Sequence, residues 1–331
     1  MNAAVPWRFP AMLHARTLVA LFGALLLLWY TGQRVEIGRM LTLSGEAVLA
    51  EAGLADRSQV ADGFGTTLGQ LVPVQFSSRR EVSRIAGFDP ARLPLFAHIE
   101  TVEARVSELD PETLRREDRI VRTAWLVEPF GYLFHVAAKM LETLEIALWG
   151  TVIAVLIGLP LALCGARNIT PHPALRVGSR ATSAFLRAVP ELIAALFLVI
   201  AYGFGPIAGV LALGLHSAGF LGKFYADDVE DADPRPQHAL AAMGVGRLTI
   251  WRAAILPQVL PQHISCTLYT FDRNVRMGAV IGLVGAGGIG QELKGRFDMY
   301  EYGHVGTILI AIFLVILTLD LATSRARRAW R

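Results

Sequence analysis

The chain has 331 residues, of which 53% are hydrophobic and only 18% are charged. Soluble domains usually carry about 25% charged residues, so this composition indicates a protein with a large lipid-facing surface. A net charge of +3 is too small to indicate a nucleic-acid partner. The two cysteines, Cys164 and Cys266, form no CxxC or Cys/His cluster, so neither a disulfide nor a metal site is expected.

The N-terminus could be mistaken for a secretion signal. Arg8 and Arg16 precede an apolar run over residues 18–30, but no small-residue cleavage site follows it. We therefore expect a retained first membrane helix at about residues 17–33, and a first region, residues 1–34, that holds this helix and a short tail.

Residues 35–130 form a long polar region with mixed charges and turn signals. The pattern at residues 111–121 predicts a helix with Asp110 as its cap. The region could be a small helical elaboration, a partly ordered loop or a docking surface for a partner.

Five more apolar stretches follow in chain order. A spanning helix needs about 20 mainly apolar residues, because its backbone must satisfy its own hydrogen bonds in lipid. With the first helix they predict an all-α polytopic membrane protein of about six spanning helices. Pro160 and Pro190 are expected to kink two of these helices. The expected helices cover residues 141–166, 184–204, 207–221, 264–289 and 305–321.

Positive charges in short loops indicate the cytoplasmic side of a membrane protein. If six helices cross the membrane, four arginine-bearing segments lie on the same side of it. That side is then the cytoplasm, the protein lies in the cell membrane, and both termini are cytoplasmic. Residues 35–130 would then lie outside the cell. The segments contain Arg8 and Arg16, then Arg167, Arg176 and Arg180, then Arg235, Arg247 and Arg252, and finally Arg325, Arg327, Arg328 and Arg331.

One cytoplasmic segment has the composition of a docking helix. It begins His238-Ala239-Leu240-Ala241 and continues to Gly244, with Leu256-Pro257 further on. Small residues let a helix approach a partner closely, Gly244 is expected to end this helix, and Pro257 to stop further helix. The alternative interpretation is an ordinary loop helix.

A second segment, residues 285–290, is rich in glycine. It fits the dinucleotide pattern G-x-G-x-x-G only loosely, and a nucleotide site would need a preceding strand. Here the glycines end an expected membrane helix, where they suit close helix packing or a broken helix that lines a cavity.

Taken together, these motifs resemble the permeases of phosphonate-type ABC importers. Residues 238–257 resemble their EAA loop, with Gly244 and Leu256-Pro257 at the family's spacing. The segment departs from the family pattern at three positions, where His238 replaces the usual Glu, Leu240 replaces Ala and Ala254 replaces Ile. The resemblance extends over residues 143–328 and includes the runs at 143–168, 187–192, 203–213 and 216–219, with Lys223, and 275–290.

The resemblance implies a methionine-permease-like core of five helices within residues 131–331. It implies a permease homodimer, a dimeric ATPase that binds ATP with magnesium, and an external binding protein. The coupling loop would cover residues 226–258. The cargo would be phosphonate, phosphite or phosphate. A permease for another small solute, such as an amino acid, and a membrane-anchored sensor are the alternatives.

Ionisable residues at mid-membrane cost about 2.5–3.5 kcal/mol, so they normally face the bundle interior or water. We expect Arg276, with Glu191 as its counter-charge, to line the transport route, because arginine suits oxyanions. A purely structural pair, or a position at the cytoplasmic boundary, is the alternative. Asp272 and Arg273 are expected at the interface. His216 could be a packed core histidine or part of a gate, and the pathway set also includes Gly285, Gly287 and Gly288.

The sequence has no catalytic signature. It lacks the P-loop pattern G-x-x-x-x-G-K-[ST] and the patterns H-E-x-x-H and G-x-S-x-G. We therefore expect a transport subunit that binds no cofactor of its own, with energy supplied by a partner ATPase.

Overall fold

The computed structural model describes residues 15–51, 58–90, 93–94, 96–109, 116–170 and 172–329. Contacts within the chain divide it into two units, residues 1–70 and residues 71–331. The first unit holds α1 (Ala15–Arg34), α2 (Ile37–Glu51) and most of α3 (Gln59–Leu71).

Helix α1 forms where the first membrane helix was expected. Helix α2 falls within the expected polar region. Together with α1, however, it is apolar enough to form one membrane span, which bends by 66° between the two helices. The large apolar side chains of α1 are exposed, among them Phe22 and Trp29, as a helix in lipid requires.

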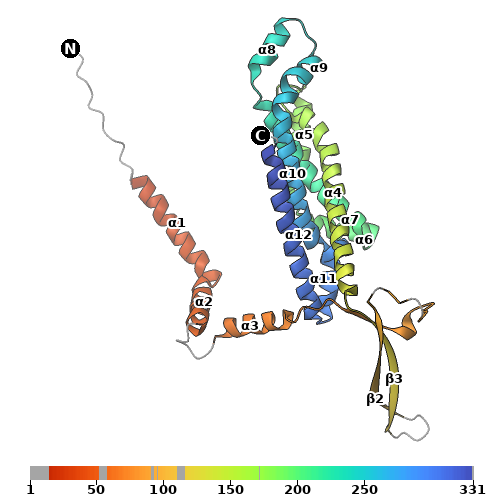
Figure 1. Cartoon of the computed structure of the whole chain (residues 1–331). Helices are drawn as coiled ribbons and strands as arrows, with labels where there is room; N and C mark the ends of the chain where they lie inside the picture. The colour runs from red at the N-terminus through yellow and green to blue at the C-terminus, as the bar shows by residue number, and fades with distance from the viewer. Residues whose placement is uncertain are drawn as a thin grey trace. The chain divides into compact units, whose positions relative to one another are not determined.

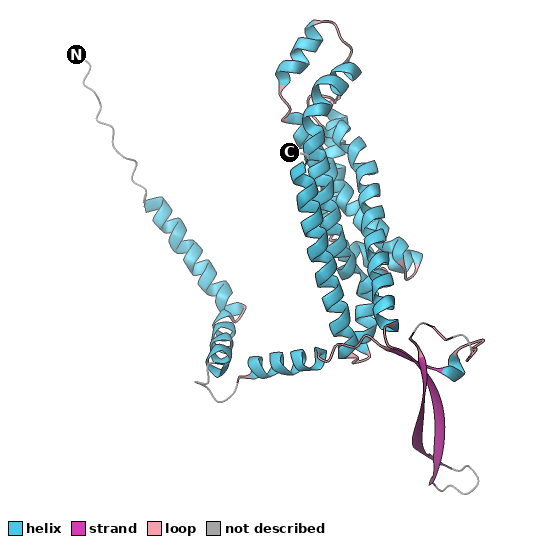
Figure 2. Cartoon of the chain, viewed as in Figure 1, coloured by secondary structure: helices cyan, strands magenta, loops and turns pink. Residues whose placement is uncertain are grey.

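The second unit combines a helical bundle with a three-stranded antiparallel sheet at one end (Figure 1). The strands are β1 (Ser78–Glu81), β2 (His98–Leu109) and β3 (Arg116–Glu128), in the order β1-β3-β2 (Figure 2). Strand β3 runs almost directly into α4, the first helix of the bundle. We call this end of the bundle the sheet end.

The helix predicted at residues 111–121 is wrong for its second half. Residues 116–121 belong to β3, while residues 110–115, including the expected cap Asp110, lie outside the described residues. Strand β3 carries β-branched and aromatic residues such as Ile120, Thr123 and Trp125, which favour a pleated strand once a partner strand is present.

The bundle follows the expected apolar stretches, but its helices have different ends. Its elements are α4 (Gly131–Gly165), α5 (Pro173–Ala188), α6 (Glu191–Tyr202), α7 (Pro206–Glu230), α10 (Leu256–Gly282), α11 (Gly288–Asp298) and α12 (Tyr302–Ala329).

The third expected helix is broken rather than kinked. Helices α5 and α6 bend by 85° at a break that contains Pro190, whose ring removes a backbone donor. The fifth expected helix is divided into α10 and α11 by a short glycine segment. Helices α4, α7 and α12 are apolar enough to span a membrane, and each bent pair adds one more span if it crosses as a unit. Helix α10 has 27 residues, but Asp272, Arg273 and Arg276 make it more polar.

Small residues bring α4 and α7 close together. Gly150, Ala154, Gly158 and Ala162 follow one another at four-residue spacing on α4, and all are buried. A Cβ atom added to Gly150 would lie 3.0 Å from the Leu213 side chain of α7. Such stripes of small residues allow close backbone approach in membrane bundles.

The end opposite the sheet carries α8 (Pro234–Ala242) and α9 (Arg247–Ile250), and we call it the α8 end (Figure 1). The start of α5 and the end of α12 lie here too, so three of the four arginine-bearing segments share one end of the bundle. Arg180 of α5 binds Asp227 and Glu230 of α7 at 3.1 and 3.0 Å. Arg8 and Arg331 lie outside the described residues, and Arg16 belongs to α1 in the first unit.

Candidate functional site

The bundle interior holds a cluster of three ionisable side chains from three helices. Glu191 lies in the first turn of α6, His216 in α7 and Arg273 in α10. Arg273 donates from Nη2 to Glu191 Oε1 and approaches His216 Nε2 at 3.1 Å. The Arg273 guanidinium also lies 5.2 Å from the ring centre of Phe220. The cluster therefore ties the broken helix to α7 and α10.

Both ring nitrogens of His216 have polar neighbours. Nε2 lies 3.1 Å from Arg273 Nη2 and 3.2 Å from Glu191 Oε1. Nδ1 donates to the carbonyl oxygen of Val189 at 3.0 Å. That carbonyl lies at the end of α5, where the break leaves it without a helical partner. His216 is thus a buried, hydrogen-bonded residue that also contacts the ion pair.

A second polar chain crosses the bundle next to this cluster. Ser217 donates to Asn274 Oδ1 at 2.8 Å, and Asn274 Nδ2 donates to Thr151 Oγ1 at 3.0 Å. All three residues are buried, and they belong to α7, α10 and α4. Because buried polar groups need partners, this chain of bonds fixes the register of the three helices.

The expected pairing of Glu191 with Arg276 is wrong. Arg276 donates to Asp272 one turn earlier on α10, at 2.5 Å, and lies 3.7 Å from Asp320 of α12. Asp272 is buried and Arg276 is half exposed. Glu191 and Arg276 therefore contact different partners.

The glycine segment between α10 and α11 is held by α4. Gly285, Gly287 and Gly288 have φ angles of 94°, 84° and 69°, which glycine adopts without the cost of a side chain. Glu142 Oε1 accepts from Gly288 N–H at 3.0 Å, and Thr143 Oγ1 accepts from the next N–H at 2.8 Å. These bonds cap the start of α11, and the negative Glu142 suits its positive dipole end.

Gly287→Ala should destabilise the protein by about 1–2 kcal/mol, because an L-residue is strained at this φ. The new Cβ would also lie 3.0 Å from Glu142 Oε1. Gly295→Ala is the matched control, since it lies within α11 and its Cβ would meet nothing within 4 Å. Thermal unfolding in detergent measures both variants, and equal melting temperatures would contradict the prediction.

Helix α8 has well-formed ends. Asp233 caps its start by accepting from Arg235 N–H at 2.9 Å. At its other end Gly244, with φ of 76°, donates to Ala241 O, and the following N–H donates to Leu240 O. This pair of bonds is the Schellman motif, so the expected helix end at Gly244 is confirmed.

The expected role of Pro257 is wrong. A π-helical turn, η2 (Trp251–Ile255), leads directly into α10, and Leu256 and Pro257 begin that helix. Proline is tolerated in a first turn because the N–H groups there have no intrahelical partner. Leu256-Pro257 therefore starts α10 instead of ending the docking segment.

The surface of α8 is open to a partner. His238, Ala239 and Ala241 are exposed, and the turn that follows exposes Met243 at 69%. Leu248 of α9 is 65% exposed. Exposed apolar side chains beside small residues are typical of a protein interface.

At the sheet end, the segment before β1 crosses the first turns of two helices. The carbonyl of Phe76 accepts from Tyr132 N–H of α4 at 3.0 Å. Gln75 N–H donates to Gly303 O of α12 at 3.1 Å, and Thr307 Oγ1 donates to Gln75 O at 2.6 Å. The sheet is therefore attached to α4 and α12 together.

Glu128, at the end of β3, links the same region by accepting from Arg80 Nη2 and Ser78 Oγ, both at 2.8 Å. The Arg80 hydrogen bond holds the pKa of Glu128 below its ordinary value. Folding thus favours the ionised form of Glu128. Its contribution to stability is fully present above the ordinary glutamate pKa of about 4.3, and it is lost as the pH falls through the lowered pKa of the folded chain.

Acidification below about pH 4 should therefore weaken the contact between β1 and the end of β3. The fluorescence of Trp125 in β3 reports this change. It is obtained by subtracting the fluorescence of the Trp125→Phe variant from that of the unmodified chain. Glu128→Gln should remove the acid transition that the difference signal shows. If the transition persists in Glu128→Gln, another group causes it.

A family model described as the binding-protein-dependent transport system inner membrane component matches residues 130–329. The chain belongs to this family. The match begins where α4 begins, so the bundle of the permease is the family's domain and the sheet precedes it. The resemblance to ABC importer permeases that the motifs indicated is confirmed.

Two relatives of the permease come from Stutzerimonas stutzeri. The permease is 51% identical over 256 residues to HtxE, named as a phosphite transport system permease protein, covering 77% of this chain and 98% of HtxE. It is 40% identical over 192 residues to the phosphite transport system permease protein PtxC, covering 58% of this chain and 70% of PtxC.

An inward-facing structure of the MetNI methionine ABC transporter has the same fold. The TM-score is 0.54 at 23% identity, over 60% of the permease and 97% of that chain. The expected methionine-permease-like fold of the permease is thereby confirmed.

The permease structure unites some expected site residues and separates others. Glu191 and His216 meet, whereas Arg276 contacts other residues. Gly285 lies on the same glycine segment as Gly287 and Gly288, and its carbonyl accepts from Gly205 N–H at 3.0 Å. The residues of α8 that were expected to couple to an ATPase lie at the end of the bundle opposite the sheet (Figure 1).

Sequence reasoning missed Arg273 as the partner of Glu191. A signal existed, because Asp272 and Arg276 are four residues apart and can pair along one helix face. That pairing leaves Arg273 as the arginine available to a different helix. Nothing in the sequence pointed to Thr151 or Asn274, whose bonds depend on how the helices pack.

Proposed function

We propose that the permease is the membrane-spanning subunit of an ATP-binding-cassette importer for a phosphorus oxyanion: phosphonate, phosphite or phosphate. The observation that carries this proposal is the 51% identity over 98% of the length of HtxE. Transport would proceed by alternating access, with two permease copies, a dimeric ATPase and an external binding protein.

Uptake into proteoliposomes tests this proposal. The vesicles contain the permease with its cognate ATPase and binding-protein partners, and labelled phosphite, phosphate or methylphosphonate is added outside. We expect ATP-dependent accumulation of at least one of these anions and none of methionine. Uptake of methionine without uptake of any oxyanion would overturn the proposal.

The α8 end would face the cytoplasm and the ATPase. The arginine-bearing segments gathered at this end support that orientation, because positive loops stay inside. Both termini would be cytoplasmic, and residues 35–130 would lie mainly outside. The exposed face of α8, with His238 and Ala239, would insert into the ATPase subunit, and Gly244 would set where the helix ends.

Hydrolysis of ATP would take place entirely on the partner subunit. The permease sequence contains no P-loop pattern, and its relatives are named as permease proteins. Movement of the ATPase would pull α8 and, through the turn Trp251–Ile255, act on α10.

The transport route would pass Arg276 on α10. Its side chain is 47% exposed in the isolated chain, whereas Arg273 and Glu191 are largely enclosed. Arg276→Ala should lower oxyanion uptake at least tenfold, or about 1.4 kcal/mol, at normal protein level. Lys294→Ala removes the same charge from an exposed pair on α11 and should leave uptake unchanged. Normal uptake by Arg276→Ala would remove this residue from the route.

A further inference from the structure

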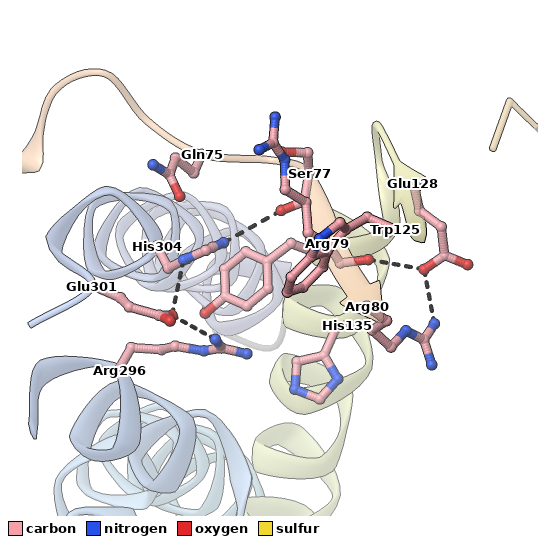
Figure 3. Close-up of a pocket in the computed structure, with 13 residues that line it drawn as sticks. Gln75, Ser77, Arg79, Arg80, Trp125, Glu128, His135, Arg296, Glu301 and His304 are labelled. Carbon is pink, nitrogen blue, oxygen red and sulfur yellow. Dashed lines mark hydrogen bonds and ion pairs between the residues drawn. The ribbon is translucent and has the colours of Figure 1, made fainter. Parts of the chain in front are cut away.

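A polar cavity of 790 Å³ lies at the sheet end, between the sheet and helices α4, α11 and α12 (Figure 3). Its volume lies within the range of about 300–1,000 Å³ that is typical of small-ligand pockets. Nitrogen-bearing side chains dominate its wall: Arg79, Arg80, Arg296, His135, His304 and Trp125.

These side chains approach the cavity from separate elements. Arg296 and His304 lie on the helical side in Figure 3, and Arg80 lies with Glu128 on the side of the strands. His304 Nε2 is 3.3 Å from the carbonyl oxygen of Ser77, which joins the two sides. The wall is therefore assembled only when the sheet is attached to the bundle.

Two carboxylates also line the cavity, and each orients an arginine. Arg80 donates to Glu128 at 2.8 Å, and Arg296 Nη1 donates to Glu301 at 2.6 Å. A guanidinium has five N–H donors, so these bonds position the arginines without using all of their donors. The lining has three arginines against two glutamates, and Arg79 has only a long contact with a carboxylate, 3.6 Å from Glu100.

The arginines differ in a way that suits ligand capture. Arg296 is rigid, because Glu292 accepts from its Nε at 2.8 Å and its guanidinium lies 4.9 Å from the Tyr132 ring centre. The side chains of Arg79 and Arg80 are 63% and 62% exposed, so their N–H groups are accessible to a solute. One fixed and two accessible guanidinium groups surround a single polar space.

We propose that this cavity binds a phosphorus oxyanion at the sheet end of the permease, independently of the route through the membrane. Guanidinium forks match the paired oxygens of such an anion. Arg79, Arg80 and Trp125 precede the region matched by the family model, so half of this site is an addition to the family's domain. The identity of the anion rests on the proposed function.

Binding to the purified full-length chain in phosphatidylcholine nanodiscs tests the cavity, with ATPase and binding protein left out. Phosphite, phosphate and methylphosphonate are titrated in turn, and ³¹P line broadening and calorimetry follow binding. We expect saturable binding of at least one anion by the unmodified chain. Arg79→Gln/Arg80→Gln should weaken it at least tenfold.

The matched control is Arg84→Gln/Arg122→Gln. It removes the same two charges from exposed residues that do not line the cavity, and affinity should stay within twofold. If the first double variant fails to fold, Arg79→Gln alone keeps the Arg80–Glu128 bond and should weaken binding at least threefold. Absence of saturable binding, or equal weakening by the control, would overturn the site.

A lipid headgroup phosphate shares the chemistry of a free oxyanion. Repeating the titration in phosphatidylglycerol nanodiscs separates the two sources. Unchanged affinity there identifies a free anion as the occupant, whereas loss of binding identifies the anionic headgroup. Both results support an oxyanion site.

Uptake and binding are separate readouts. A permease that imports phosphite with its partners, yet binds no oxyanion alone, would overturn the cavity and leave the proposed function intact. A permease that binds these anions but imports none would overturn the proposed function and leave the cavity.

Discussion

Arg273→Met is expected to destabilise the permease by about 3–5 kcal/mol, the usual cost of removing one partner from a buried ion pair. Glu191 would remain largely enclosed, with a side chain only 13% exposed, and without its guanidinium partner. His216 would lose its contact with the Arg273 guanidinium, which weakens the connection of α7 with α10. Thermal unfolding in detergent measures the loss, and oxyanion uptake should disappear with it.

The double variant Arg273→Met/Glu191→Leu separates the ion pair from the rest of the site. Replacing both charges with apolar groups should restore most of the stability, because no unpaired charge remains. If uptake stays absent in a stable double variant, the pair also serves transport. A loss below about 1 kcal/mol in Arg273→Met alone would contradict the buried pair.

Gly244→Val is expected to separate ATP hydrolysis from transport. Valine at a φ of 76° is strained by about 1–2 kcal/mol, which shifts the population of the α8 end by roughly five- to thirtyfold. Oxyanion uptake, and stimulation of ATP hydrolysis by the binding protein, should therefore fall about tenfold. The bundle itself should unfold at an unchanged temperature, because α8 buries none of its residues and can release the strain locally.

Gly246→Val is the control for this change. Gly246 has φ of −66° and ψ of 154°, an extended conformation that valine adopts readily, and its Cβ would also meet nothing. The rates of oxyanion uptake and of stimulated ATP hydrolysis should both stay within twofold of those of the unmodified permease. If uptake falls equally in Gly244→Val and Gly246→Val, the size of the added side chain causes the loss, and the conformation of the end of α8 does not.

Hydropathy predicts which segments form the bundle but not where each helix ends. The apolar window for α4 starts near residue 141, yet the helix starts at Gly131. Polar residues such as His135 and Lys139 lower the hydropathy of this stretch, but the helical hydrogen bonds continue through them. A hydropathy threshold therefore detects only the apolar part of the helix. The sharp break at Pro190 was expected only as a kink, because its angle depends on contacts with α7 and α10.

The sheet could not be predicted from local patterns. Strand β1 has four residues and pairs with β3 some 50 positions later, as in Ser78 opposite Glu128. Pairing over such a separation depends on tertiary contacts that no short window contains. The cavity beside the sheet was missed for the same reason, because its wall needs residues from both sides of that pairing.

The site was predictable where one helix decides the outcome. The end of α8 follows from Gly244 and its neighbours alone, and the expectation was confirmed. The partner of Glu191 lies 82 residues away, and only the four-residue spacing of Asp272 and Arg276 favoured Arg273 over Arg276. Composition identified the right residue types, and helix packing decided between them.

The stripe of small residues on α4 constrains how the permease moves. With no side chain between the backbones at Gly150 and Gly158, α4 cannot slide along α7 without steric overlap. We therefore expect these two helices to move together in any conformational change of the permease. The bend at Pro190 and the π-helical turn Trp251–Ile255 are then the places where we expect the helices to change direction.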